Sequence, residues 1–141
     1  MMSSGTGAVI YVFSEDHCPP HVHARHRGEE WVARVRFSFL EDTVRLMSIA
    51  PLRNSPSHRS VNRLLGDIQT GLPACRRLWW TNRQTTCLED QWAIVSPMAV
   101  SLVSRQETAA KRIDSAFYDV TSERVVIHFH DGTASTLRGD L

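Results

Sequence analysis

The sequence predicts an α+β protein: an antiparallel sheet covered by two helices, with a C-terminal β-hairpin. Three observations support this fold class. Apolar and polar residues alternate over residues 31–39, apolar residues recur at steps of three and four after about residue 55, and an Asp-Gly pair separates two short runs near the C-terminus. Alternation is typical of a half-buried strand, steps of three and four of a helix, and Asp-Gly of a hairpin turn. Strands and helices therefore fall into separate blocks of the chain.

The first block should contain four strands, at residues 8–13, 21–25, 31–39 and 44–50. The first of these is rich in the β-branched and aromatic residues that strands favour. Alternation is strongest in the third, where it places five apolar residues on a face that should belong to the core. These residues are Trp31, Ala33, Val35, Phe37 and Phe39.

The helical block carries one apolar stripe at helical spacing. The stripe comprises Val61, Leu64, Leu65, Ile68, Leu72, Cys75, Leu78 and Trp79. A Gly-Leu-Pro segment interrupts it, which predicts two helices, roughly residues 56–70 and 73–85, rather than one long helix. Ser55 suits the N-cap of the first helix, and Pro56 suits its first helical position.

The C-terminal part of the chain predicts a hairpin, because residues 124–129 and 134–138 flank the turn HDGT. Residues 92–105 are apolar but contain a proline, so a strand and a short helix both stay open there. We expect residues 1–90 to form a domain of sheet and two helices. Residues 91–141 would be a linker and hairpin segment, whose strands extend the first sheet or form a small second one.

The composition predicts a soluble globular chain of about one domain. Its 141 residues are 42% hydrophobic and 22% charged, and no stretch approaches the roughly 20 apolar residues of a membrane span. The N-terminus has neither a basic segment nor a long apolar one, which argues against a secretory signal and for the cytoplasm. Three cysteines without Cys-x-x-Cys spacing fit free, packed thiols better than a disulfide framework or a structural zinc site.

Positive charge is concentrated in the middle of the chain. Residues 25–83 contain eleven arginines and five acids, a balance of +6, whereas residues 84–141 carry five basic groups and eight acids, a balance of −3. The planar guanidinium group of arginine suits bidentate contacts to phosphate or carboxylate. Codon bias in a GC-rich bacterial genome would produce the same excess of arginine.

The segment DHCPPHVHARH, residues 16–26, holds four of the seven histidines. If residues 21–25 form a strand, two of these histidines lie on one face, because side chains alternate along a strand. A third lies across the pair of prolines. Three protein ligands with an open position make a catalytic zinc site. The candidate ligands, which would also be the catalytic centre, are His17, His21 and His23, with Asp16 or Glu15 as a carboxylate.

Two other interpretations compete with this metal site: metal-free acid–base or phosphate chemistry, and a structural or partner-binding motif. The sequence favours the last. Pro19 and Pro20 each fix φ at about −65° and form a rigid bend. The candidate ligands all come from one short hairpin, and no distant residues complete them. We therefore expect no tightly bound transition metal, no other cofactor and no catalytic residue.

A second candidate site surrounds Trp80 on the second predicted helix. Trp79 belongs to the apolar stripe, so Trp80 lies about 100° further around the helix and should be partly exposed. An exposed tryptophan among arginines is typical of protein interfaces, and it also serves as a stacking platform for single-stranded nucleic acid. The predicted binding residues are Arg59, Arg63, Arg76, Arg77, Trp80 and Arg83.

Two segments resemble known families. SEDHCPPHVHARHRGEEWVARV is similar to the opening of the bacterial domain-of-unknown-function family 4160 and carries its His-x-Pro-Pro-His-x-His signature. The matching positions are His17, Pro19, Pro20, His21 and His23, and the resemblance covers about residues 6–90. RIDSAFYDVTSERVVIHFHDGTASTLRGDL, within residues 111–141, resembles the hairpin end of domain-of-unknown-function family 2442. Both resemblances imply a gene context of toxin–antitoxin systems and mobile elements, and neither implies an activity.

Three functional hypotheses follow. The leading one is a non-catalytic binding module of a toxin–antitoxin or mobile-element system, which inhibits or regulates a protein partner such as a toxin or a component of host or phage defence. The second is a nucleic-acid-binding regulator that uses the same arginine-rich surface. The third is a small metal-dependent hydrolase or nuclease centred on the histidine cluster. No Gly-x-Ser-x-Gly, Walker or His-Glu-x-x-His motif is present, and a homo-oligomer is compatible with the sequence.

Overall fold

The computed structural model describes residues 2–3, 7–51 and 56–138 of the chain. The chain forms two compact units. Unit 1 contains Met1–Ser38 and Asp42–Gln84, and unit 2 contains Phe39–Glu41 and Thr85–Leu141. Each unit has one antiparallel sheet, and both helices belong to unit 1. The predicted α+β class is therefore confirmed.

The sheet of unit 1 is a meander in which each strand pairs with the next one in the chain. Its order is β1-β2-β3-β4-β5, and all of its pairs are antiparallel. The four strands expected from the sequence are all present, and a two-residue strand precedes them. The strands are β1 (Met2–Ser3), β2 (Ala8–Tyr11), β3 (His21–His26), β4 (Trp31–Arg36) and β5 (Arg45–Pro51).

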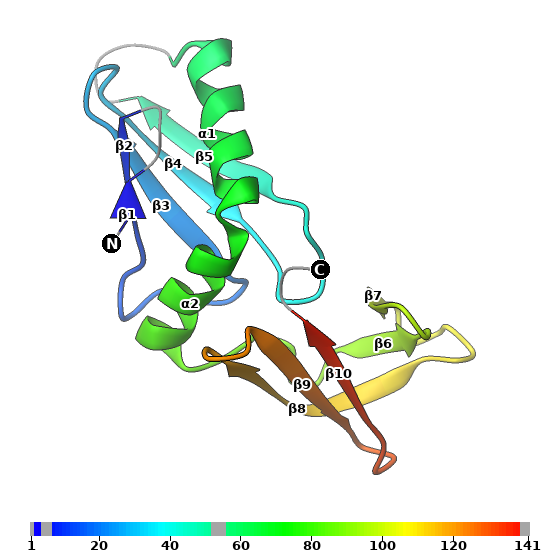
Figure 1. Cartoon of the computed structure of the whole chain (residues 1–141). Helices are drawn as coiled ribbons and strands as arrows, with labels where there is room; N and C mark the ends of the chain where they lie inside the picture. Colours follow the sequence, from blue (N-terminus) through cyan, green and yellow to red (C-terminus); the bar gives the residue numbers. More distant parts are fainter. Residues whose placement is uncertain (1, 4–6, 52–55, 139–141) are drawn as a thin grey trace. The chain divides into compact units, whose positions relative to one another are not determined.

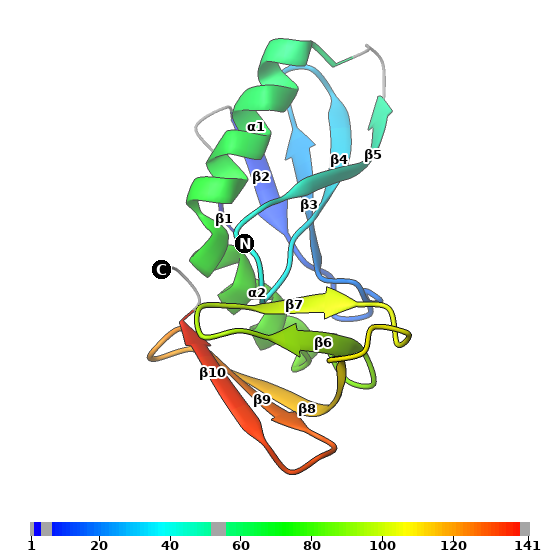
Figure 2. The same cartoon turned by 90° about the vertical axis from the view of Figure 1, so that its right-hand side faces the viewer.

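Two helices, α1 (His58–Thr70) and α2 (Leu72–Arg83), lie on one face of this sheet (Figures 1 and 2). The N-cap of α1 is Ser57, whose hydroxyl accepts a hydrogen bond from the Ser60 N–H at 3.1 Å. The helix thus begins two residues later than the sequence predicts, and the expected cap Ser55 lies outside the described residues. Among those residues, no helix has the length and apolar character needed to cross a membrane.

The core of unit 1 lies between the helices and the covered face of the sheet. Alternate residues of β3 and β4 face it, in agreement with the predicted periodicity, and Trp79 packs there while Trp80 is half-buried. The fully buried members are Val22, Ala24, Trp31, Ala33, Val35, Leu64, Ile68, Cys75 and Trp79. The opposite face of β3 and β4 is left for polar side chains, because successive residues of a strand point to opposite sides.

The sheet of unit 2 has the order β10-β9-β8-β6-β7 and is antiparallel throughout. Residues 92–105, which the sequence leaves open between strand and short helix, contain two strands. In β9 the side chains alternate: Val125, Ile127 and Phe129 are buried, and His128 is exposed. The strands are β6 (Trp92–Val95), β7 (Val100–Val103), β8 (Lys111–Asp119), β9 (Arg124–Phe129) and β10 (Ala134–Arg138).

The cysteines differ from the expectation of three free thiols. Cys75 is free and fully buried in unit 1. Cys18 and Cys87 are disulfide-bonded. Burial of Cys75 raises the pKa of its thiol to about 12, although the neighbouring Arg76 cation acts in the opposite direction. The prediction of a free, packed thiol is therefore confirmed for Cys75, whereas the prediction of free thiols is wrong for Cys18 and Cys87.

Candidate metal site

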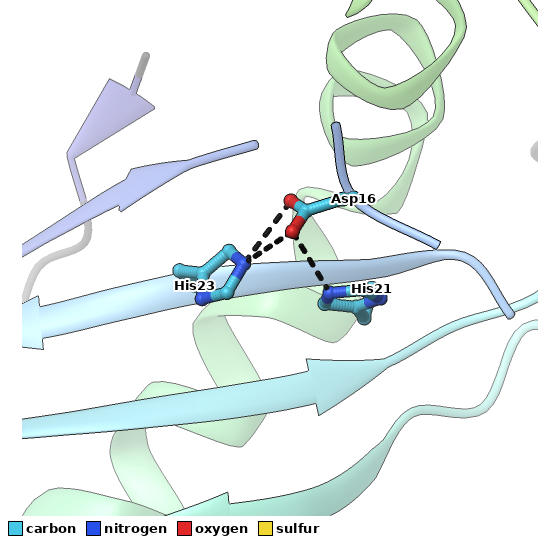
Figure 3. A group of neighbouring side chains, drawn as sticks. All are labelled: Asp16, His21 and His23. Carbon is cyan, nitrogen blue, oxygen red and sulfur yellow. Dashed lines mark hydrogen bonds and ion pairs between the residues drawn. The ribbon is translucent and has the colours of Figure 1, made fainter. Parts of the chain in front are cut away.

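Two histidines and one aspartate converge at the beginning of β3 (Figure 3). His21 and His23 are two positions apart on the strand and therefore lie on the same side of it. Asp16 reaches them from the loop that precedes the strand. One nitrogen from each histidine and one carboxylate oxygen all lie within 4.8 Å of one another. We call these three residues the His–Asp site.

A reciprocal pair of hydrogen bonds with Phe13 holds the carboxylate of Asp16 in place. The Phe13 N–H donates to Oδ2 of Asp16 at 2.8 Å, and the Asp16 N–H donates to the Phe13 carbonyl at 3.1 Å. Partial burial raises the pKa of Asp16, but the bond from Phe13, the bond from His23 and the nearby imidazoles outweigh it. The pKa therefore lies below the ordinary value. Asp16 is consequently an anion at neutral pH, as a metal ligand must be.

His21 is oriented by the backbone of the proline bend. Its Nδ1 lies 2.8 Å from the carbonyl oxygen of Pro19. Because a carbonyl can only accept, Nδ1 carries the proton, and the neutral ring then has a free lone pair on Nε2. That Nε2 points toward Asp16, whose Oδ1 is 3.6 Å away. The ring also packs against Trp79, with 5.3 Å between ring centroids.

His23 is held between the carboxylate and two aromatic rings. Its Nε2 lies 3.1 Å from both carboxylate oxygens of Asp16 and donates to them, because a carboxylate only accepts. Its ring stacks on Tyr11 at 5.3 Å with an interplanar angle of 10°, and the ring of Phe13 is 4.9 Å away. The aromatic contacts leave the imidazole little freedom to turn away from Asp16.

The two separations between histidine nitrogens and the carboxylate are close to those around a shared ion, and all three ligand atoms lie within 4.8 Å of one another. Two ligand atoms about 2.1 Å from one metal lie about 3.0 Å apart in octahedral geometry and about 3.4 Å apart in tetrahedral geometry. The observed Nε2-to-carboxylate distances are 3.1 Å for His23 and 3.6 Å for His21. The side chains are 12%, 7% and 12% exposed for His23, His21 and Asp16. A metal could therefore enter with small side-chain movements.

A pocket of about 200 Å³ opens beside the His–Asp site. Its lining combines the two ligands Asp16 and His21 with charged groups from the loop and from β4, and with an apolar group from β5. The lining residues are Glu15, Asp16, His17, Cys18, Pro19, His21, Arg34 and Met47. A small substrate or solvent can thus reach the place where an ion would sit.

The structure brings only some residues of the histidine motif into the His–Asp site. His21 and His23 come together as the alternation predicts, whereas His17 is exposed and lines the pocket without joining them. The carboxylate in the group is Asp16, one of the two acids that the sequence offered. The bond from His21 to Pro19 gives the proline bend a role in orienting a ligand.

The predicted arginine and tryptophan surface is not assembled as expected. Arg76 is buried, with 1% exposure; its Nε donates to the Ser38 carbonyl at 3.0 Å, and its Nη2 lies 3.3 Å from Asp42. Arg83 is half-buried and donates through Nη1 to the Ser14 carbonyl. The remaining arginines, Arg59, Arg63 and Arg77, are exposed. The predicted exposure of Arg76 is therefore wrong, because this side chain packs into unit 1.

Comparisons of the chain with protein-family models, with curated proteins and with solved structures give no match.

Proposed function

We propose that the protein is a small metal-dependent hydrolase in which Asp16, His21 and His23 hold a divalent transition metal. The observation that carries this proposal is the orientation of His21. Its Nδ1 is held by the Pro19 carbonyl at 2.8 Å, so its Nε2 faces Oδ1 of Asp16, 3.6 Å away. A metal-binding histidine usually donates its other ring nitrogen in this way, which fixes the ring and strengthens the ligand.

Two histidines and a carboxylate leave coordination positions for water and substrate. A bound divalent ion lowers the pKa of its water, so that hydroxide is available near neutral pH. Glu15 and His17 line the adjoining pocket and are suited to exchange protons with that water and with a leaving group. The same ligand set also holds iron(II) in oxygen-using enzymes.

Backbone groups orient the candidate ligands. A metal was not expected because the ligands lie on one hairpin without residues to orient them. The Phe13 N–H and the Pro19 carbonyl supply this orientation from the backbone, which residue types alone do not reveal. Backbone groups serve as well as side chains for this purpose.

The test is a zinc titration of the purified, metal-stripped protein by calorimetry. We expect one zinc ion per chain. His21→Ala, His23→Ala and Asp16→Asn should each weaken the affinity at least about tenfold. His17→Ala is the matched control, because it removes a neighbouring imidazole outside the group of three, and it should keep the affinity of the wild type. Loss of affinity in His17→Ala with retention in Asp16→Asn would overturn the assignment, as would a wild type that takes up no zinc.

A further inference from the structure

A row of arginines continues from the His–Asp site along the strand register of the first sheet. In the strand register His21 is opposite Arg36, and Arg36 is opposite Arg45; His23 is opposite Arg34. Directly opposed residues of an antiparallel pair have their side chains on the same face, with Cβ atoms about 5 Å apart. We call Arg34, Arg36 and Arg45 the arginine row.

The arginine row is electrostatically unfavourable without an anion. Arg36 and Arg45 are directly opposed like charges, an arrangement that destabilises a sheet. All three arginines are exposed, and no ion pair joins any of them to an acid in the described part of the chain. Arg34 donates through Nε to the Ser48 hydroxyl at 3.0 Å, which orients its guanidinium while its other N–H groups stay available. It also lines the pocket. Such a row is suited to phosphate.

An aromatic side chain lies on the other side of the site. Phe13 is 47% exposed although its ring is 4.9 Å from the His23 ring and 5.1 Å from the Tyr11 ring. An exposed ring at this distance from a metal ligand can stack with a base. Stacking of this kind requires a base that is free of a duplex, and together with a cationic track it is how proteins hold single-stranded nucleic acid.

We propose, resting on the metal-dependent function above, that the substrate is single-stranded nucleic acid and that the protein hydrolyses its phosphodiester bonds. The arginine row binds the phosphate, and Phe13 stacks with an adjacent base. The oxygen of water forms a new bond to phosphorus, and the bond from phosphorus to the leaving oxygen breaks. One proton of the water passes to Glu15 or solvent, and the leaving oxygen takes up one proton. The products are a phosphomonoester and an alcohol, and no further reactant is needed.

Binding is measured by fluorescence anisotropy with short labelled single-stranded DNA and RNA and the full-length, zinc-loaded protein. We expect the double variant Arg36→Ala/Arg45→Ala to bind about tenfold more weakly. In this variant, the slope of log affinity against log salt concentration should become less steep by about 0.7 for each phosphate contact that is lost. Phe13→Ala should weaken binding about tenfold without changing that slope. Arg27→Ala, an exposed arginine of the turn after β3, is the matched control.

Cleavage of the same oligonucleotides is followed on gels, together with zinc affinity and circular dichroism for every variant. The proposal is supported if the wild type cleaves with zinc, and if the arginine variant loses binding and cleavage while it keeps its fold and its zinc. If the protein binds zinc but no oligonucleotide, the assignment of the substrate is wrong and the metal site is unaffected. The same conclusion follows if Arg27→Ala weakens oligonucleotide binding as much as the arginine double variant does. A wild type that takes up no zinc overturns the hydrolase itself. Anisotropy without metal then still decides whether the arginine row binds nucleic acid.

Discussion

The Nδ1 of His21 donates to the carbonyl oxygen of Pro19 over 2.8 Å, and this bond fixes which nitrogen of the ring is open to a ligand. We expect nitrogen NMR of labelled protein to show His21 with a protonated Nδ1 and a bare Nε2. Zinc should shift the Nε2 signal. The exposed His128 of unit 2 serves as the control and should not respond. A His21 ring protonated on Nε2 would remove the basis of the metal assignment.

Asp16 should make the stability of unit 1 depend on pH in the acid range. Because its pKa is lowered in the folded protein, its contribution to stability is full above the pKa of the unfolded chain, about 3.9. That contribution is lost as the pH falls through the folded-state value. Asp16→Asn should therefore cost about 1.5 kcal/mol near neutral pH and little at strongly acid pH. Urea unfolding at several pH values measures this difference, with Glu15→Gln as the neighbouring control. A cost of Asp16→Asn that does not vary with pH would contradict it.

Arg76 should matter for stability rather than for association. Its guanidinium is buried against Ser38 and Asp42, so Arg76→Ala leaves the Ser38 carbonyl without this donor and creates a gap. We expect a loss of about 2 kcal/mol or more in the free energy of unfolding. Arg59→Ala, at an exposed position of α1, should stay within about 0.5 kcal/mol of the wild type. Equal stability of the two variants would show that Arg76 is a surface residue after all.

Cys75 should be unreactive in the native protein. Its burial leaves almost no thiolate at pH 8, since the pKa of the thiol is about 12, and the thiolate is the reactive form. A chromogenic disulfide reagent should therefore give no signal with the folded protein. Without reductant, it should release about one equivalent on denaturation, because Cys75 is the free cysteine. Rapid labelling of the folded chain at Cys75, identified by mass spectrometry, would contradict its packed position.

Periodicity predicts those elements whose pattern is set by one strongly amphipathic face. The alternation of Trp31, Ala33 and Val35 located β4, and the stripe through Leu64 and Ile68 located α1. The four-residue strands β6 and β7 were not assigned, because strands so short, next to a proline, give no more than two alternations. Element type follows from pattern only where enough turns or alternations accumulate.

The candidate site also has a part that the sequence predicts and a part that it does not. Strand alternation places His21 and His23 together, but the choice of Asp16 over His17 depends on the turn that Phe13 closes through its backbone. The residue types alone do not show which of these two side chains the turn directs toward His21 and His23. Arg76 shows the converse: helical spacing puts it beside Trp80, yet its burial depends on where the loop containing Ser38 passes. The hypothesis of a protein partner therefore stays a prediction, without Arg76 among its binding residues.

The three candidate ligands lie within eight residues along the chain, from Asp16 to His23. Closing so short a loop costs little conformational entropy, so the unfolded polypeptide keeps part of its ability to chelate. A ligand that binds both states stabilises the native one only by the difference between the two affinities. Saturating zinc should therefore raise the melting temperature less than the native-state affinity alone implies. A newly made chain would then begin to bind zinc, more weakly than the native protein, before the sheet has assembled around the site.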